Sequence, residues 1–157
     1  MAGRDVSDAQ LIRQCIRLAK RAVKKGNHPF GALLALDGAI LLTAENTVTT
    51  DRDWTGHAEL NLIKLARLEL DAAALSRCSI YSSTEPCSMC AGAIYQAGVP
   101  RVVFGCSSEA LKGVTGGKAD IACKQMFSAA SLPIEVVGPI LEAESLALHR
   151  RFWKNER

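Results

Sequence analysis

Four side chains in two short segments of this sequence have the types and spacing of a catalytic zinc site. His57 and Glu59 stand two residues apart, and Cys87 and Cys90 form a C-x-x-C pair that follows Pro86. Imidazole nitrogen and thiolate sulfur are usual zinc ligands, and a catalytic zinc site uses three protein ligands and keeps the fourth position for water. We therefore predict that His57, Cys87 and Cys90 bind Zn²⁺. Glu59 is then the catalytic proton shuttle, close enough to reach the water without binding the metal.

Two other interpretations of these residues stay open. A structural zinc site has four protein ligands. The fourth could come from any of His28, His149, Cys78, Cys106 and Cys123. A C-x-x-C pair alone is also compatible with thiol redox chemistry. A structural site needs neither the Glu59 offset nor a proline before the cysteine pair, so the catalytic interpretation is preferred.

Length and composition are those of a soluble globular protein. The chain has 157 residues, of which 48% are apolar and 22% charged, and this predicts a single domain over residues 1–157 with its own core. No apolar run approaches the roughly 20 residues of a membrane helix, and the first ten residues lack a signal-peptide core. We expect a cytoplasmic protein with no membrane partner, whose cysteines outside the C-x-x-C pair are buried thiols.

The net charge of +3 is weak support for a nucleic-acid partner, because a dedicated binder usually concentrates basic residues on one face. Two basic clusters do occur: Lys20, Arg21, Lys24 and Lys25, then Arg150, Arg151, Lys154 and Arg157. We interpret both as solvated helix faces.

Periodicity and turn residues predict alternating strands and helices. Predicted helices cover Asp8 to Lys25, His57 to Leu70, Pro86 to Ala97, Ala119 to Ser128 and Leu141 to Lys154. Predicted strands cover Gly31 to Leu36, Ala39 to Ala44, Cys78 to Ser83, Arg101 to Cys106 and Ile134 to Val137. Asp37-Gly38 predicts an antiparallel hairpin, and the later strands alternate with helices, which indicates parallel crossovers. The predicted fold is α/β, with three layers (α/β/α) around a mixed five-stranded sheet.

Connecting segments complete the pattern. Asn46 to Gly56 is predicted as a polar connection, and Leu111 to Lys118, with three glycines, as a loop. His57 and Cys87 each follow a loop and open a helix, with Pro86 at the first helical position. Unpaired N–H groups at helix N-termini stabilise thiolates and a metal-bound hydroxide. One helical turn brings the sulfurs of Cys87 and Cys90 to the same side.

The sequence resembles the cytidine deaminase-fold superfamily of zinc enzymes. The similarity runs from the first helix to Cys106 and rests on four segments: Pro29-Phe30-Gly31-Ala32, Asn46, His57-Ala58-Glu59, and Thr84-Glu85-Pro86-Cys87-Ser88-Met89-Cys90-Ala91-Gly92-Ala93-Ile94-Tyr95. These look like the branch that holds guanine deaminases, yeast-type cytosine deaminases and tRNA adenosine deaminases. In such sites, hydroxide formed at zinc attacks an amino-bearing ring carbon, and a glutamate carries protons to the ring and to the leaving amine.

The resemblance implies roles for several further residues and a homodimer. Asn46 would hydrogen-bond the substrate, Phe30 would pack near the base, and the backbone N–H of Ala58 or Cys87 would take part. Asn46 also fits a turn position, and Phe30 alone would suit a core.

Four other side chains are candidates for substrate binding. His28 is either a surface histidine or a pocket residue, and Trp54 is either pocket wall or dimer contact. Phe152 and Trp153 are similar to the aromatic C-terminal cap of yeast-type cytosine deaminases. We interpret this pair as an anchor that also controls access to the pocket.

The function predicted from these features is zinc-dependent hydrolytic deamination of a nucleobase or related heterocycle. Pro29-Phe30-Gly31-Ala32 and Gly92-Ala93-Ile94-Tyr95 look most like guanine deaminases, so guanine is the leading substrate and cytosine the next. The segment from Pro133 to Leu141 is similar to tRNA adenosine deaminases, and a tRNA substrate is the alternative. A zinc-bound scaffold without turnover is a third possibility, which the intact Glu59 disfavours.

Overall fold

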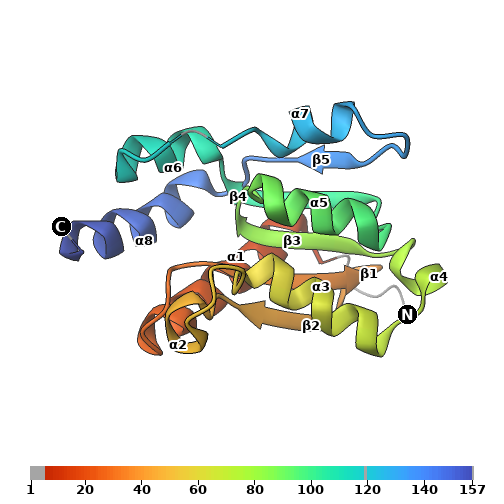
Figure 1. Cartoon of the computed structure of the whole chain (residues 1–157), viewed down its shortest axis with the longest axis horizontal. Helices are drawn as coiled ribbons and strands as arrows, with labels where there is room; N and C mark the ends of the chain where they lie inside the picture. The colour runs from red at the N-terminus through yellow and green to blue at the C-terminus, as the bar shows by residue number, and fades with distance from the viewer. Residues whose placement is uncertain (1–5, 119, 157) are drawn as a thin grey trace.

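A mixed five-stranded sheet forms the centre of the protein, as predicted. The computed structural model describes residues 6–118 and 120–156. The strand order is β2-β1-β3-β4-β5 (Figure 1). The strands are β1 (Gly31–Leu36), β2 (Ala39–Glu45), β3 (Ser79–Thr84), β4 (Arg101–Cys106) and β5 (Glu135–Val137). β1 pairs antiparallel with β2 and β3, while β3, β4 and β5 run parallel.

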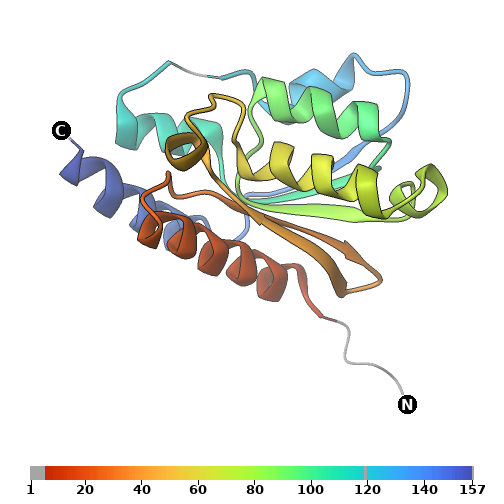
Figure 2. The same ribbon diagram turned by 60° about the horizontal axis from the view of Figure 1, so that its bottom comes forward.

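Helices cover both faces of the sheet, which gives the predicted three layers. One face carries α1 (Asp8–Lys24) and α8 (Glu142–Asn155), and the other carries α3 (Ala58–Glu69) and α5 (Ser88–Ala97) (Figure 2). Alternate residues of the central strand β1 enter the two cores. Leu33 packs with the apolar side of α1, and Leu34 packs with α3 and α5. Because both faces of β1 are buried, its sequence is a continuous apolar run rather than an alternating one.

Local sequence signals account for the first helix and the hairpin. Ser7 caps α1 with its side chain, and Gln10 completes a capping box with the Ser7 backbone. Asp37 and Gly38 both have positive φ, at 50° and 78°, as a tight hairpin turn between β1 and β2 requires. The predicted antiparallel hairpin is therefore confirmed.

The segment predicted as a loop over Leu111 to Lys118 is instead mostly helix, and this prediction was wrong. Helix α6 spans Ser108–Thr115. Ser107 caps it by accepting a hydrogen bond from the backbone N–H of Ala110 at 3.1 Å. Gly116, with φ of 69°, ends the helix in the left-handed conformation. The helix forms because the cap at Ser107 and the stop at Gly116 stabilise it by more than Gly113, inside the helix, destabilises it.

Other boundaries also differ from the predictions. Pro86 is not the first helical residue, because Cys87 is extended and acts as N-cap of α5. Helix α7 covers only Cys123–Ser128 of the stretch predicted from Ala119, and Ala119 lies outside the described residues. Single-turn helices α2 (Val48–Asp51) and α4 (Ala72–Leu75) occupy connections that the sequence left unassigned or polar. Within the described part of the chain, no helix is long and apolar enough to cross a membrane.

Candidate functional site

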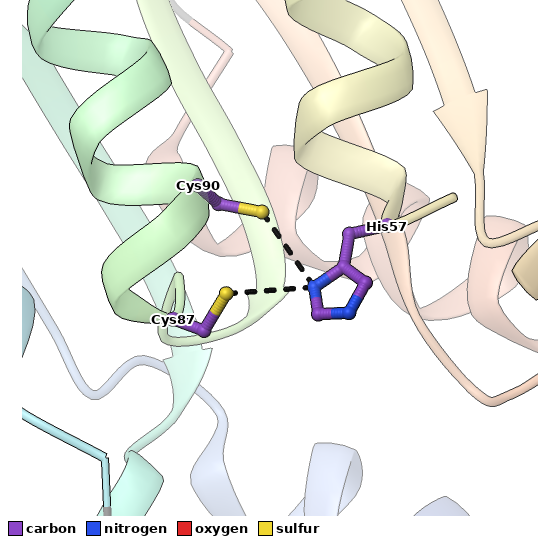
Figure 3. Close-up of side chains that lie close together, drawn as sticks. All are labelled: His57, Cys87 and Cys90. Atoms are coloured by element: carbon purple, nitrogen blue, oxygen red, sulfur yellow. Dashed lines mark hydrogen bonds between the residues drawn. The ribbon is translucent and has the colours of Figure 1, made fainter. Parts of the chain in front are cut away.

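The predicted metal ligands meet between the first turns of α3 and α5. His57 is the N-cap of α3, Cys87 is the N-cap of α5, and Cys90 lies one turn further along α5. The His57 Nδ1 atom lies 3.5 Å from the Cys87 Sγ atom and 3.6 Å from the Cys90 Sγ atom (Figure 3). All three donor atoms lie within 4.8 Å of one another. Two elements that are far apart in the sequence thus present one nitrogen and two sulfurs to the same point.

The geometry of this cluster suits a tetrahedral zinc ion. Zn–S bonds of about 2.3 Å and Zn–N bonds of about 2.0–2.1 Å, at the tetrahedral angle, place sulfur and nitrogen about 3.6 Å apart. The separations from the His57 nitrogen to the two sulfurs match this value. No fourth His, Cys, Asp or Glu among the described residues joins the group. The donor set therefore has the three-ligand composition of a catalytic site.

The five side chains considered as a fourth ligand lie outside the metal-ligating group, and Cys123 is fully buried at the start of α7. His149 is bonded to Thr84, Cys78 donates to the Ala74 carbonyl at 3.2 Å, and Cys106 lies 3.5 Å from the Thr84 hydroxyl. His28 contacts the rings of Phe152 and Trp153.

The two thiols of the cluster titrate as a pair. Hydrogen bonds from Cys90 and then His57 lower the pKa of the Cys87 thiol to about 4, against the cost of its partial burial. The same contact with Cys87, together with burial, raises the pKa of Cys90. Without a bound cation, Cys87 is therefore the thiolate of the pair and Cys90 keeps its proton. A divalent metal ion would displace that remaining proton, which couples metal binding to pH.

Glu59 faces the same space from the first turn of α3. Its side chain is 4% exposed, and its Oε1 atom accepts a hydrogen bond from the Ser82 hydroxyl at 2.7 Å. Burial raises the pKa of Glu59, while the bond from Ser82 opposes that rise. A carboxyl group whose pKa is raised toward neutrality suits both proton uptake and proton release. The geometry thus fits the shuttle predicted from the sequence.

His57, Cys87 and Glu59 line a cavity of about 210 Å³, and Cys90 is fully buried. The lining residues of the cavity are Phe30, His57, Glu59, Thr84, Glu85, Cys87, Ser108, Leu111, Lys112, Thr115, Lys118 and Asp120. A larger hollow of about 550 Å³ lies between α6 and α8, but its lining contains neither the metal-ligating side chains nor Glu59. Chemistry rather than size therefore identifies the smaller cavity as the candidate active site.

Glu85 lines the cavity and holds two neighbouring helices, a role that its place in the sequence does not predict. Its Oε2 atom accepts from the Ser108 N–H at 2.9 Å, and its Oε1 atom accepts from the Cys123 N–H at 2.8 Å. These are the first residues of α6 and α7, where unpaired N–H groups favour an anion. One carboxylate thus fixes the start of both helices beside the cavity.

Of the residues assigned to substrate binding by resemblance, Phe30 lies at the cavity, and Ala58 lies between His57 and Glu59 at the start of α3. Because Ala58 is the first residue of α3, its N–H is one of the groups without an intrahelical partner. Ala58 itself is fully buried and is not among the residues that line the cavity. Asn46 is also buried, and its Oδ1 atom accepts from the Val48 N–H at 3.1 Å as a turn residue does. Asn46 is not among the residues that line the cavity.

Four predicted residues lie elsewhere in this chain. His28, Phe152 and Trp153 pack against one another, with the His28 ring 5.9 Å from Phe152 and 5.3 Å from Trp153. Trp54 is 86% exposed in the loop before α3. None of the four lines the cavity, so direct substrate contact from them stays a prediction without support from this geometry.

The proteins that this chain resembles are zinc-binding deaminases, which agrees with the composition of the site. Residues 5–106 match the family model of the cytidine and deoxycytidylate deaminase zinc-binding region. A probable cytosine deaminase of Schizosaccharomyces pombe is 35% identical over the whole of both chains. A guanine deaminase of Bacillus subtilis is 45% identical over 59% of this chain and 60% of its own length. A solved structure from work on tRNA:A34 deaminases has a TM-score of 0.73 and 27% identity, covering 88% of this chain and 97% of that one.

The chain belongs to the zinc-binding cytidine and deoxycytidylate deaminase family. It is a hydrolytic deaminase, as its sequence motifs predicted, and its fold is that of its solved relatives.

Proposed function

We propose that the protein hydrolytically deaminates a free nucleobase or a closely related amino-heterocycle, with guanine the leading substrate and cytosine the next. The single observation that carries this proposal is that His57 and Cys87 of the three-donor cluster line one small cavity together with buried Glu59. Residues 1–157 act as one zinc-dependent domain, because the cavity draws its lining from positions as distant as Phe30 and Asp120.

The chain's own groups divide the work of the reaction. His57, Cys87 and Cys90 would hold Zn²⁺, which would supply the Lewis acidity needed to activate a water molecule at neutral pH. Glu59 accepts a proton from that water, and the oxygen attacks the ring carbon that bears the amino group. Glu59 then gives that proton to the ring nitrogen, takes the second proton from the hydroxyl group newly formed on the carbon and passes it to the amine, the C–N bond breaks, and ammonia leaves. Water and the amino-heterocycle thus become ammonia and the oxo-heterocycle.

Cavity size and relatives support a free base as substrate. A volume of about 210 Å³ lies below the roughly 300–1,000 Å³ of pockets that enclose drug-sized ligands. A flat ring in such a space is read by stacking, for which Phe30 is placed, and by hydrogen bonds at its edge. Relatives named for cytosine and guanine deamination are consistent with this class.

A tRNA adenosine substrate is the second candidate, and one observation favours it. Lys112 and Lys118 line the cavity, and Arg150 and Lys154 line the neighbouring hollow between α6 and α8. Cations at a pocket mouth attract a phosphate backbone, and such binding weakens steeply as salt rises.

A substrate panel distinguishes these candidates. Zinc-loaded protein is incubated with guanine, cytosine, adenine, their nucleosides and an anticodon stem-loop, and ammonia release is measured. Chelator-treated protein is the control, and it should release none. Release from guanine or cytosine alone supports the proposal, and release only from the stem-loop would replace it with the second candidate. No release from any member would contradict the proposal and favour a scaffold without turnover.

We also propose that the enzyme is a cytoplasmic homodimer. Exposed apolar side chains stand on α3, on α5 and in the loop before α3: Trp54 at 86%, Leu68 at 84% and Met89 at 39%. A second copy of the chain packed on these elements would remove this apolar surface from water. All six cysteines are free thiols, the state that a reducing compartment maintains. Sedimentation of the parent and of a Trp54→Ser, Leu68→Ser variant tests the dimer: the variant should sediment as a monomer.

A further inference from the structure

A buried histidine stands directly behind the wall of the cavity. His149, on α8, is 1% exposed, and its Nε2 atom lies 2.8 Å from the Oγ1 atom of Thr84. Its ring centroid lies 5.1 Å from that of Phe30. Thr84 and Phe30 both line the cavity, while His149 itself does not. Any effect of this imidazole on a bound substrate must therefore pass through its neighbours.

The hydrogen bond on the other side of the ring sets the tautomer of His149. The Nε1–H group of Trp153 donates to the His149 Nδ1 atom at 3.2 Å. An indole nitrogen can only donate, so Nδ1 must be the unprotonated nitrogen. Burial lowers the pKa of His149 to about 4, so the imidazole is neutral at pH 7 and carries a single ring proton. That proton is on Nε2 and points at Thr84.

This tautomer determines what the Thr84 hydroxyl can do. A hydroxyl group has one proton to donate and can accept two hydrogen bonds. Since His149 donates to Thr84, the Thr84 proton is not directed to His149. Among the described residues, the other hydrogen-bond partner of this hydroxyl is Cys106, whose thiol donates weakly to it at 3.5 Å. The strongest acceptor that this proton can meet is then a group inside the cavity.

We propose that Thr84 is a specificity-determining residue, whose hydroxyl donates a hydrogen bond to an acceptor atom on the edge of the bound ring. That acceptor is a carbonyl oxygen or an unprotonated ring nitrogen, and a ring that presents an N–H group there is disfavoured. His149 and Trp153 are positioning residues that impose this polarity from the far side of the wall. The inference rests on the proposed function, since it concerns the ring that the cavity binds.

The tautomer can be measured without any turnover. Long-range ¹H–¹⁵N correlation spectra of the zinc-loaded, ¹⁵N-labelled protein at pH 7 distinguish the two ring nitrogens of each histidine. The His149→Gln variant identifies the signals of His149. Protonation at Nε2 with a bare Nδ1 is the expected result. Protonation at Nδ1 would overturn the proposal, because the Thr84 hydroxyl would then donate its proton to the bare Nε2 atom of His149. This readout stays decisive even if no member of the substrate panel is deaminated.

Kinetics on the best substrate of the panel provide the second test. Thr84→Val removes the hydroxyl but keeps the shape, and loss of one hydrogen bond should raise KM about 5- to 20-fold with little change in kcat. Thr84→Ser should restore KM to within about twofold of the parent value, because it restores the donor. Thr43→Val, a matched change on an exposed residue of β2, should leave both constants unchanged.

A purely structural role would have a different signature. Poor folding around position 84 would lower kcat through loss of active protein and leave KM unchanged, and Thr84→Ser would share part of the defect. Either result would overturn the proposal. Trp153→Phe gives an independent check, because it removes the indole donor without altering the cavity wall. It should give a measurable population of His149 protonated at Nδ1 and a rise in KM in the same direction as Thr84→Val, whereas an unchanged tautomer would contradict the positioning role.

Discussion

The hydroxyl of Ser82 donates a hydrogen bond of 2.7 Å to Oε1 of Glu59. Ser82 lies on β3 and Glu59 on α3, so the bond joins the sheet to the helix that carries the proton shuttle. It also reduces the rise in the Glu59 pKa that burial causes. The bond therefore sets both the position and the acidity of this carboxyl group.

Replacing Ser82 should shift the pH profile of the enzyme. Glu59 must be ionised to accept a proton from water, so activity falls as pH drops through its pKa. Ser82→Ala removes an interaction that lowers this pKa, so the acid limb of the kcat/KM profile should move to higher pH. Ser83→Ala is the matched control, because Ser83 is an equally buried hydroxyl that bonds the Gly31 N–H rather than Glu59. An identical profile in Ser82→Ala and the parent would contradict the assignment.

The carboxylate of Glu85 should hold α6 and α7 in place. Glu85→Gln keeps one acceptor oxygen but turns an amide group toward the second N–H. Hydrogen bonds to charged groups contribute about 1.5–3 kcal/mol, which corresponds to a fall in Tm of about 3–12 °C for a chain of this length. Hydrogen exchange at the Ser108 and Cys123 amides should accelerate. Glu109→Gln, an exposed change on α6, is the control, and equal protection of both amides in Glu85→Gln would refute the bridging role.

Metal content should depend on the cysteines of the cluster and not on the other buried thiols. Cys90→Ala removes one of three ligands, so zinc measured after dialysis should fall well below about one ion per chain. Cys78→Ala alters a buried cysteine whose thiol bonds the Ala74 carbonyl, and it should retain the metal. Full zinc retention in Cys90→Ala would show that another residue completes the site.

His149 should make stability depend on pH. Its folded-state pKa is about 4, below the value of 6.5 for an unburied histidine. The unfolded chain therefore binds more protons between these values, and stability falls as pH drops from 6.5 toward 4. The loss over this window is about 3 kcal/mol. Denaturant unfolding of chelator-treated parent and His149→Gln protein at several pH values tests this: the variant should lack most of the slope, and parallel curves would contradict it.

Much of the fold could be predicted because its signals are local. The turn at Asp37-Gly38 could be predicted from these two residues alone, because both residue types tolerate the positive φ that the turn requires. The zinc ligands could also be predicted from the sequence, because His57 and the Cys87/Cys90 pair lie in short local motifs. Helix α6 was missed although its signals were present: Ser107 is a good cap and Gly116 a good stop, but the glycines were interpreted as loop residues.

The rest of the site depends on contacts between residues far apart in the sequence. Glu85 bonds amides 23 and 38 positions away, and Thr84 meets His149 across 65 positions. Sequence separation does not predict such contacts, because the order of the strands in the sheet determines which strand end lies next to which helix. The folded structure is required to see that His149, first considered as a possible zinc ligand, stands behind the cavity wall instead.

Ammonia release by the Glu59→Gln variant, loaded with zinc and compared with the parent on the same substrate, tests the central claim most directly. Glutamine fits the same space but cannot carry a proton, so zinc content should stay unchanged while turnover falls by several orders of magnitude, on the order of 10³-fold or more. Turnover within about tenfold of the parent would contradict the account, because some other group would then move the protons.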